Sequence, residues 1–166
     1  MIPVSDWMTK RVLTVELVDS LGRARRLMVK HRVNQLPVLE DGKLVGIVTD
    51  RDIRDAYPTS MAIDRGKEID RFAERYTVEE VISYNLFTVE PTTPLAAAVR
   101  LLRSHRIGSL PVVEKGKLVG IITRSDILDF VLTQKSLAPA EEQPGKKPKR
   151  ARKRPPARRS ATRASR

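Results

Sequence analysis

The sequence predicts an α/β fold of the mixed α+β kind, in which two tandem β-α-β-β-α repeats pack about a pseudo-twofold axis and precede a disordered C-terminal tail. Three observations predict it. Residues 4–55 align on residues 78–129 without a gap, and nearly half of the aligned residues are identical, which indicates a tandem duplication. Helical and strand periodicities alternate in the same order in both copies. From about residue 135 the apolar residues almost disappear, as in chains that cannot bury a core.

Each repeat opens with a short turn, "VSDWM" or "VEEVI", and a brief strand that ends at Thr14-Val15 or Thr88-Val89. A helix then begins at about Ser20 or Pro94, because Ser is a preferred N-cap and Pro suits a first helical turn. Helical spacing places the following apolar residues on one face of each helix: Leu21, Ala24, Leu27 and Met28, and Leu95, Ala98, Leu101 and Leu102.

The strands "QLPVLE" and "KLVGIVT" come next, joined by Asp41-Gly42, a pair typical of a tight hairpin. A last helix is expected over about 50–56, and over 124–132 in the second copy. One unit is too small to bury both faces of its sheet, so the copies should share a core. We therefore predict repeat 1 over 1–57, a linker over 58–76 that packs partly on the body, repeat 2 over 77–134, and a tail over 135–166.

Composition excludes several classes of function. The chain has no Cys and two His, so no disulfide, thiolate metal site or cysteine nucleophile is possible, and we expect neither a metal site nor catalytic residues. No apolar run approaches the ~18 residues of a membrane span, and the N-terminal residues lack the apolar region of a signal peptide. We expect a soluble, cytoplasmic protein with no stable membrane insertion.

The two repeats share a strand-to-helix turn, "GIVTDRDI" and "GIITRSDI", with Thr three residues before Asp. One interpretation is structural: Thr49 caps the helix, and Asp52 offsets the helix dipole in the first turn. The other is functional, because a helix N-terminus attracts phosphate and a carboxylate can accept hydrogen bonds from a ribose diol. The duplication at Thr123 and Asp126 favours the second interpretation without excluding the first.

The stretch "VSDWMT…VLTVE…ARRLMVKHRVNQLPVLEDGKLVGIVTDRDI" resembles a CBS domain, and residues 77–132 resemble a second one. Together they resemble a CBS-domain pair, or Bateman module, of the stand-alone prokaryotic type related to the acetoin-utilisation regulator. The resemblance implies a regulatory sensor that is not an enzyme and has no obligatory cofactor. Its effector would be AMP, ADP, ATP or S-adenosylmethionine, bound in clefts between the repeats of a homodimer.

The resemblance also assigns roles to residues. Asp52 and Asp126 would hold the ribose, Thr49 and Thr123 the ribose or phosphate, and Arg51 a phosphate. The adenine would be walled by residues of the strands: Thr14, Val15, Pro37, Thr88, Val89 and Pro111. Asn34-Gln35 and Gly108-Ser109 occupy positions where some relatives contact phosphate.

The net charge of +12 belongs mainly to the tail, because residues 135–166 carry +10 and residues 1–134 only +2. An alternative function is therefore non-specific binding of DNA or RNA by the tail, with the repeats as a dimer scaffold. Base stacking is not expected, because the tail has no aromatic residue. The basic residues concerned are Lys146, Lys147, Lys149, Arg150, Arg152, Lys153, Arg154, Arg158 and Arg159.

Overall fold

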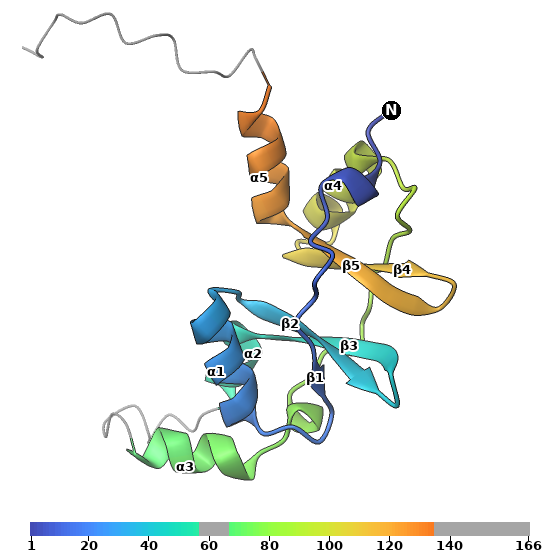
Figure 1. Ribbon diagram of the computed structural model, residues 1–166. Helices are drawn as coiled ribbons and strands as arrows, with labels where there is room; N and C mark the ends of the chain where they lie inside the picture. The colour runs from blue at the N-terminus through green and yellow to red at the C-terminus, as the bar shows by residue number, and fades with distance from the viewer. Residues whose placement is uncertain (57–66, 135–166) are drawn as a thin grey trace, which may run out of the picture.

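The computed structural model describes residues 1–56 and 67–134, with side chains for all of these except 67–70. Two stacked halves are visible, each with a small sheet and its own helices (Figure 1). The predicted disorder of the tail lies outside the described residues, and so does Pro58, a residue expected to stop the helix predicted over about 50–56.

The first repeat has the predicted β-α-β-β-α order. After a 3-10 helix, η1 (Val4–Asp6), come β1 (Val15–Glu16), α1 (Leu21–His31), β2 (Gln35–Glu40), β3 (Lys43–Thr49) and α2 (Asp50–Asp55). The strands form one sheet in the order β1-β2-β3, with β1 parallel to β2 and β2 antiparallel to β3.

The second repeat contains η3 (Val78–Glu80), α4 (Leu95–Ser104), β4 (Ser109–Glu114), β5 (Lys117–Thr123) and α5 (Arg124–Leu132). Strands β4 and β5 pair antiparallel, in the same register as β2 and β3. The predicted first strand of this repeat is reduced to one parallel bridge, between Val89 and Val112. The mixed α/β fold with two matching repeats is thereby confirmed.

Capping and turn chemistry explain the element boundaries. The Ser20 hydroxyl accepts a hydrogen bond of 3.1 Å from the Arg23 backbone N–H at the start of α1. At the other end, Arg32 adopts the left-handed conformation that closes a helix, with φ of 55°. In the hairpin turn, Asp41 and Gly42 both have positive φ, 48° and 75°, as a two-residue turn of the predicted type requires.

The predicted linker contains a helix that the sequence did not suggest, α3 (Lys67–Arg75), and it packs on α1 (Figure 1). Phe72 and Ala73 are buried. Glu74 accepts hydrogen bonds from the Ser20 hydroxyl, at 2.8 Å, and from the Arg26 guanidinium. The predicted packing of this segment on the body is therefore confirmed for Phe72, while Ile63 and the Ile69 side chain lie outside what is described.

The segment that precedes β1 in the sequence packs on the second repeat, and the segment that begins at Val78 packs on the first repeat. Val4 and Met8 belong to the core of the second repeat, where Trp7 meets Phe130 edge-on with ring centroids 5.1 Å apart. Val78 belongs to the core of the first repeat. Backbone bridges at Thr9–Ile121 and Ile47–Ser83 join the halves, and each is the counterpart of the other in the repeat alignment. This exchange relates the halves by an approximate twofold axis.

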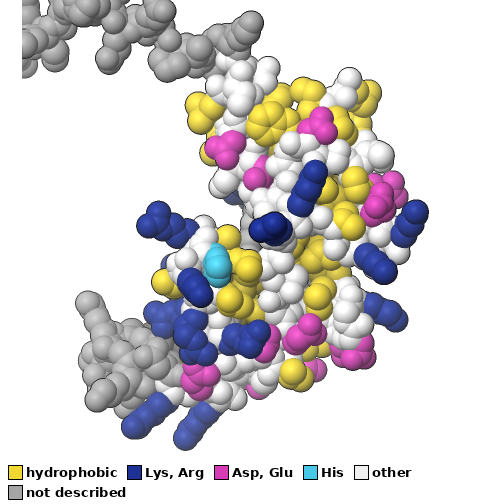
Figure 2. All heavy atoms as spheres, viewed as in Figure 1, with side chains coloured by type: hydrophobic (Ala, Val, Ile, Leu, Met, Phe, Trp, Pro, Cys, Tyr) yellow, Lys and Arg dark blue, Asp and Glu magenta, His cyan; other side chains and the backbone are white. Residues whose placement is uncertain are grey.

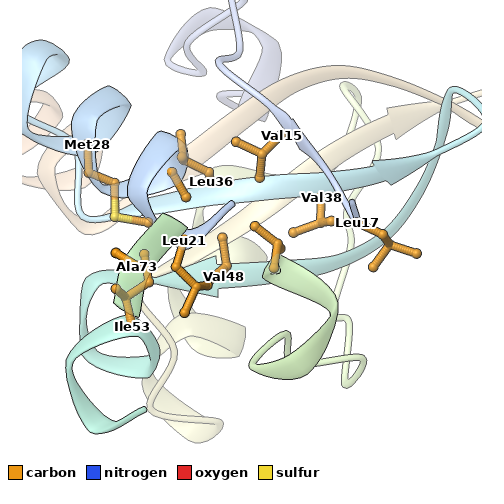
Figure 3. Packing of buried hydrophobic residues seen from close by; sticks show 11 residues of the cluster. Val15, Leu17, Leu21, Met28, Leu36, Val38, Val48, Ile53 and Ala73 are labelled. Carbon is orange, nitrogen blue, oxygen red and sulfur yellow. The ribbon is translucent and has the colours of Figure 1, made fainter. Parts of the chain in front are cut away.

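The core cluster of the first repeat is aliphatic, and in the second repeat the aromatic side chains of Trp7, Phe87 and Phe130 pack against an aliphatic core. In the first repeat, side chains from β1, β2, β3, α1 and α2 converge on one cluster, and Ala73 of α3 completes it (Figure 3). The helices cover the outer face of each sheet, which leaves the inner faces and the strand ends of the two repeats facing one another (Figure 1).

Candidate ligand-binding cavities

Both repeated Thr-x-x-Asp turns are capping boxes. The Thr49 hydroxyl accepts from the Asp52 backbone N–H at 3.2 Å, and Asp52 Oδ2 accepts from the Thr49 N–H and hydroxyl at 2.8 and 2.7 Å. Thr123 and Asp126 repeat this arrangement, with Asp126 Oδ2 accepting two bonds of 2.7 Å. Among the described residues, no hydrogen bond reaches Oδ1 of either carboxylate. The capping interpretation is confirmed, and it leaves one oxygen of each Asp available to a ligand.

A cavity of about 670 Å³, the wide cavity, lies between the two repeats beside the start of α5. The first repeat contributes residues from the segment before β1 and from the α1–β2 connection, and the second contributes the end of β5 and the start of α5. The lining consists of Thr9, Arg11, Val12, Leu13, His31, Arg32, Val33, Asn34, Gln35, Leu36, Pro37, Ile121, Thr123, Ser125 and Asp126.

The lining of the wide cavity carries more basic than acidic residues. Arg11 and Arg32 line it together with His31, and Asp126 is its one acidic residue. Within residues 1–56 and 67–134, neither Arg11 nor Arg32 forms an ion pair, so both guanidinium groups can bind an anion. Figure 2 shows a hollow between the two halves, on the side of α1 and α5, with basic side chains and a His at its rim.

A second cavity of about 250 Å³, the narrow cavity, occupies the corresponding position beside the start of α2. Phe87 takes the place of Leu13 here and stacks on His105, with ring centroids 3.8 Å apart and planes 27° apart. This stacked pair adds bulk beside the narrow cavity. Its lining consists of Gln35, Ile47, Thr49, Asp52, Ser83, Asn85, Phe87, Arg106, Ile107, Gly108 and Ser109.

Each cavity combines residues of both repeats, and the exchanged segments explain why. The Thr9–Ile121 bridge holds the segment before β1 against β5, so Pro37 of the first repeat shares the wide cavity with Thr123 and Asp126 of the second. The Ile47–Ser83 bridge likewise holds the segment that contains Ser83 against β3. Asp52 of the first repeat therefore lines the narrow cavity together with residues of the second repeat.

Six of the predicted site residues line neither cavity. Val15 and Val89 are buried in the cores of their repeats, because strand alternation turns them away from the interface. Thr14, Thr88 and Pro111 are absent from both linings. The Arg51 side chain is 83% exposed and pairs with Asp55 at 3.8 Å, four residues along α2. Its counterpart Ser125 does line the wide cavity.

Several lining residues were not singled out from the sequence. Arg32 and Arg106 each follow a His at equivalent positions of the two repeats. This duplicated His-Arg pair could have indicated from the sequence that both Arg residues line a cavity. Arg11 and Asn85 gave no signal, because the repeats differ at this position. Of the four residues at positions where some relatives contact phosphate, Asn34 lines the wide cavity, Gln35 lines both cavities, and Gly108 and Ser109 line the narrow one.

The nine basic residues proposed to bind nucleic acid lie outside the described residues, so that function stays a prediction. Within the described ranges, no three His, Cys, Asp or Glu side chains gather as metal ligands. In the same part of the chain, no helix is long and apolar enough to cross a bilayer.

Comparison with known proteins agrees with this arrangement. The chain is 33% identical over 131 residues to a CBS domain-containing protein of Dictyostelium discoideum, covering 78% of this chain and 90% of that one. A crystal structure of a Vibrio cholerae protein assigned to acetoin utilization, AcuB, matches with a TM-score of 0.68 and 32% identity, covering 80% of this chain and 91% of that one.

The CBS domain pair of protein MJ0100, solved in complex with 5′-methylthioadenosine and S-adenosyl-L-methionine, matches with a TM-score of 0.64 and 27% identity, covering 79% of this chain and 96% of that one. The model of the CBS domain family matches residues 4–59 and 78–133. The chain belongs to the CBS domain family, as a tandem CBS-domain pair.

Proposed function

We propose that this CBS pair is a regulatory module that senses an adenosine-containing ligand bound in the wide cavity. One observation carries the proposal: a single cavity joins the free carboxylate oxygen of Asp126 in the second repeat to the unpaired guanidinium of Arg11 in the first. A ligand with a ribose at one end and an anionic group at the other would satisfy both. Its binding would also tie the two repeats together, which is what a regulatory signal requires.

The lining divides into parts that suit the parts of a nucleotide. Asp126 Oδ1 can accept hydrogen bonds from ribose hydroxyls while Oδ2 keeps its capping role. Pro37 and Val33 give an apolar wall for adenine. Ser125 is the second residue of α5, so its backbone N–H has no intrahelical partner and is available to phosphate. The cavity volume lies within the range of about 300–1,000 Å³ usual for small-molecule sites.

The charge of the lining favours AMP, ADP or ATP. Two Arg side chains face one Asp, so the cavity attracts phosphate more strongly than the sulfonium group of S-adenosylmethionine. The MJ0100 complex supports the adenosine part of the proposal, because both of its ligands contain adenosine. S-adenosylmethionine is the alternative effector, held by the same ribose and adenine contacts. We expect the ligand to act by changing the arrangement of the repeats, without chemical conversion.

We also propose that the chain forms a homodimer through a groove on α4 and α5. The groove encloses about 440 Å³ and contains Leu102, Ile127 and Leu128, with Arg124 at its rim. Leu128 is 63% exposed, and its counterpart in the first repeat is Arg54, so this exposed apolar residue belongs to the second repeat only. Burial of the apolar residues of this groove between two copies would remove them from water, which supports an interface there.

A thermal-shift panel of AMP, ADP, ATP and S-adenosylmethionine tests the sensing function. Free ligand at about 100 times its dissociation constant should add about 2.7 kcal/mol, a rise in Tm of roughly 5–10 °C for a chain of this size. Asp126→Asn should abolish most of the rise, and Asp129→Asn, the same change on an exposed part of α5, should not. Absence of a shift with all four ligands contradicts the proposal.

A further inference from the structure

One residue lines both cavities. Within residues 1–56 and 67–134, Gln35 is the single residue common to the two linings. It begins β2, paired across the sheet with Thr49 at the end of β3. Its side chain therefore forms part of the wall between the two candidate ligand sites.

The second repeat makes room for the Gln35 side chain. A Cβ atom added to Gly108 would lie 2.9 Å from Gln35 Oε1, closer than such contacts allow, so the amide packs directly over the Gly108 backbone. The residue equivalent to Gly108 in the first repeat is Asn34, which has a side chain. The space that Gly108 leaves for a neighbouring side chain is therefore present in the second repeat only.

The counterpart of Gln35 in the second repeat is Ser109. The Ser109 hydroxyl is buried and has no hydrogen-bond partner among the described residues, and the residue is 2% exposed. A buried hydroxyl without a partner is costly, and such groups in native proteins call for an explanation. Ser109 lines the narrow cavity together with Gln35 and Gly108, so a ligand there could supply the missing partner.

We propose that Gln35 couples the two cavities, so that a ligand in the wide cavity weakens binding in the narrow one. This inference depends on the proposed adenosine-ligand binding. The Gln35 amide makes no side-chain hydrogen bond within the described part of the chain, so its donors and acceptor are free for ligands. One amide takes one orientation at a time. A ligand in the wide cavity that holds this amide removes it from the narrow cavity, where Ser109 and an incoming ligand are left with fewer partners.

The coupling can be measured by NMR on the full-length ¹⁵N-labelled chain, with AMP as the probe. The Ser125 backbone amide reports the wide cavity, and the Asn85 backbone amide reports the narrow one. We expect the wide cavity to bind AMP more tightly, so in the wild type the Asn85 curve should report narrow-cavity binding with the wide cavity filled. In Asp126→Asn it reports the same binding with the wide cavity nearly empty. We expect the Asn85 dissociation constant to fall by about fivefold in Asp126→Asn, the lower end of usual coupling between sites.

Removal of the shared side chain should abolish that difference. In a Gln35→Ala background, Asp126→Asn should leave the Asn85 dissociation constant unchanged. Gly108→Ala is a second variant, because its new methyl group displaces the Gln35 amide without removing it. Gln134→Ala, an exposed glutamine at the end of α5, is the matched control and should keep the fivefold difference.

Each other outcome has a definite meaning. Equal Asn85 curves in wild type and Asp126→Asn, a change of the opposite sign, or a fivefold difference that survives Gln35→Ala would overturn the coupling. Movement of Ser125 with a still Asn85 would overturn it too, while the proposed sensing function stands. If neither amide moves with AMP, ADP, ATP or S-adenosylmethionine, the sensing function itself is contradicted.

Discussion

At the scale of single residues, Asp52 and Asp126 combine a capping role with the ligand-binding role that we propose for them. One carboxylate oxygen completes a capping box with the preceding Thr, and the other has no hydrogen-bond partner among the described residues, in a side chain that lines a cavity. The structural and functional interpretations of the Thr-x-x-Asp turn are therefore compatible. Substitution by Asn keeps an acceptor for the cap and removes the charge, so it is the variant that separates the two roles.

Arg11 gives the most specific prediction for a single residue. Arg11→Gln should weaken AMP binding by about tenfold, because a hydrogen bond to a charged group contributes about 1.5 kcal/mol or more. Binding of adenosine, which has no phosphate, should stay within about twofold by the same reasoning. Isothermal titration calorimetry with both ligands measures this. Lys10→Gln removes the same charge from an exposed neighbour outside the lining and should leave both affinities unchanged. Equal losses for AMP and adenosine would show that Arg11 does not meet phosphate.

The repeated glycines of β3 and β5 should differ in their tolerance of a side chain. A Cβ on Gly46 would lie 2.6 Å from the Ser83 carbonyl oxygen, which is bonded to the Ile47 N–H. At Gly120 the obstacle is the flexible Met8 side chain. Gly46→Ala should cost about 1–3 kcal/mol of unfolding free energy by overpacking, and Gly120→Ala less than about 1 kcal/mol. Urea unfolding compares them, and similar losses would contradict the difference.

At the scale of the elements, the sequence predicts most of the strands and helices and their caps, because duplication shows each signal twice. Ser20, Asp41-Gly42 and the Thr-x-x-Asp turns all have the local roles expected of them. Helix α3 could not be predicted in this way, because the linker occurs once. The packing of the segment before β1 on the opposite repeat could not be predicted either. It depends on contacts such as the one between Thr9 and Ile121, which local periodicity does not encode.

That exchange decides which residues share a cavity. Pro37 and Asp52 belong to the same repeat, whereas the wide cavity brings Pro37 together with Asp126 of the other repeat. Arg11 could not be predicted, because Asn85 stands at its position in the second repeat and its cavity neighbours Thr123 and Asp126 belong to that repeat. The resemblance assigns Arg51 to phosphate, whereas in this structure its side chain is 83% exposed and pairs with Asp55 along α2.

The packing of α3 on α1 should become less stable as the pH falls. Hydrogen bonds from Arg26 and from Ser20 lower the pKa of Glu74 below its ordinary value of 4.5. A carboxyl group with a lowered folded-state pKa stabilises the fold above its unfolded pKa, and this contribution is lost as pH falls through the folded value. NMR titration of the side-chain carboxyl should give a Glu74 pKa below 4.5 that returns toward 4.5 in Arg26→Ala. Arg23→Ala, which removes a partner of Asp19 instead, should leave it unchanged, and a normal Glu74 pKa in the wild type would contradict the contact.

At the scale of the whole molecule, the two repeats are alike in fold and unlike in their sites. The wide cavity has Arg11, Leu13 and Asn34 where the narrow cavity has Asn85, Phe87 and Gly108. Duplication therefore supplied one scaffold twice, and divergence at a few lining positions separated the cavities in volume and charge. We expect the wide cavity to bind the anionic effector more tightly.

The outer faces are unlike too, and this predicts how copies associate. Leu128→Glu should convert a homodimer to a monomer, because it places a charge in the apolar groove on α4 and α5. Size-exclusion chromatography with light scattering measures the mass directly. Val18→Glu introduces the same charge at an exposed residue elsewhere and should leave the dimer intact. A wild-type monomer, or a dimer that survives Leu128→Glu, would show that this groove does not join two copies.

The location of bound AMP tests the proposed sensor most directly. In a crystal structure of the full chain grown with AMP, we expect the ribose beside Asp126 Oδ1, the adenine against Pro37 and the phosphate within hydrogen-bond reach of Arg11. Crystals in which AMP leaves the wide cavity empty, or lies there with its phosphate away from both Arg11 and Arg32, would contradict the assignment of this cavity as the sensing site.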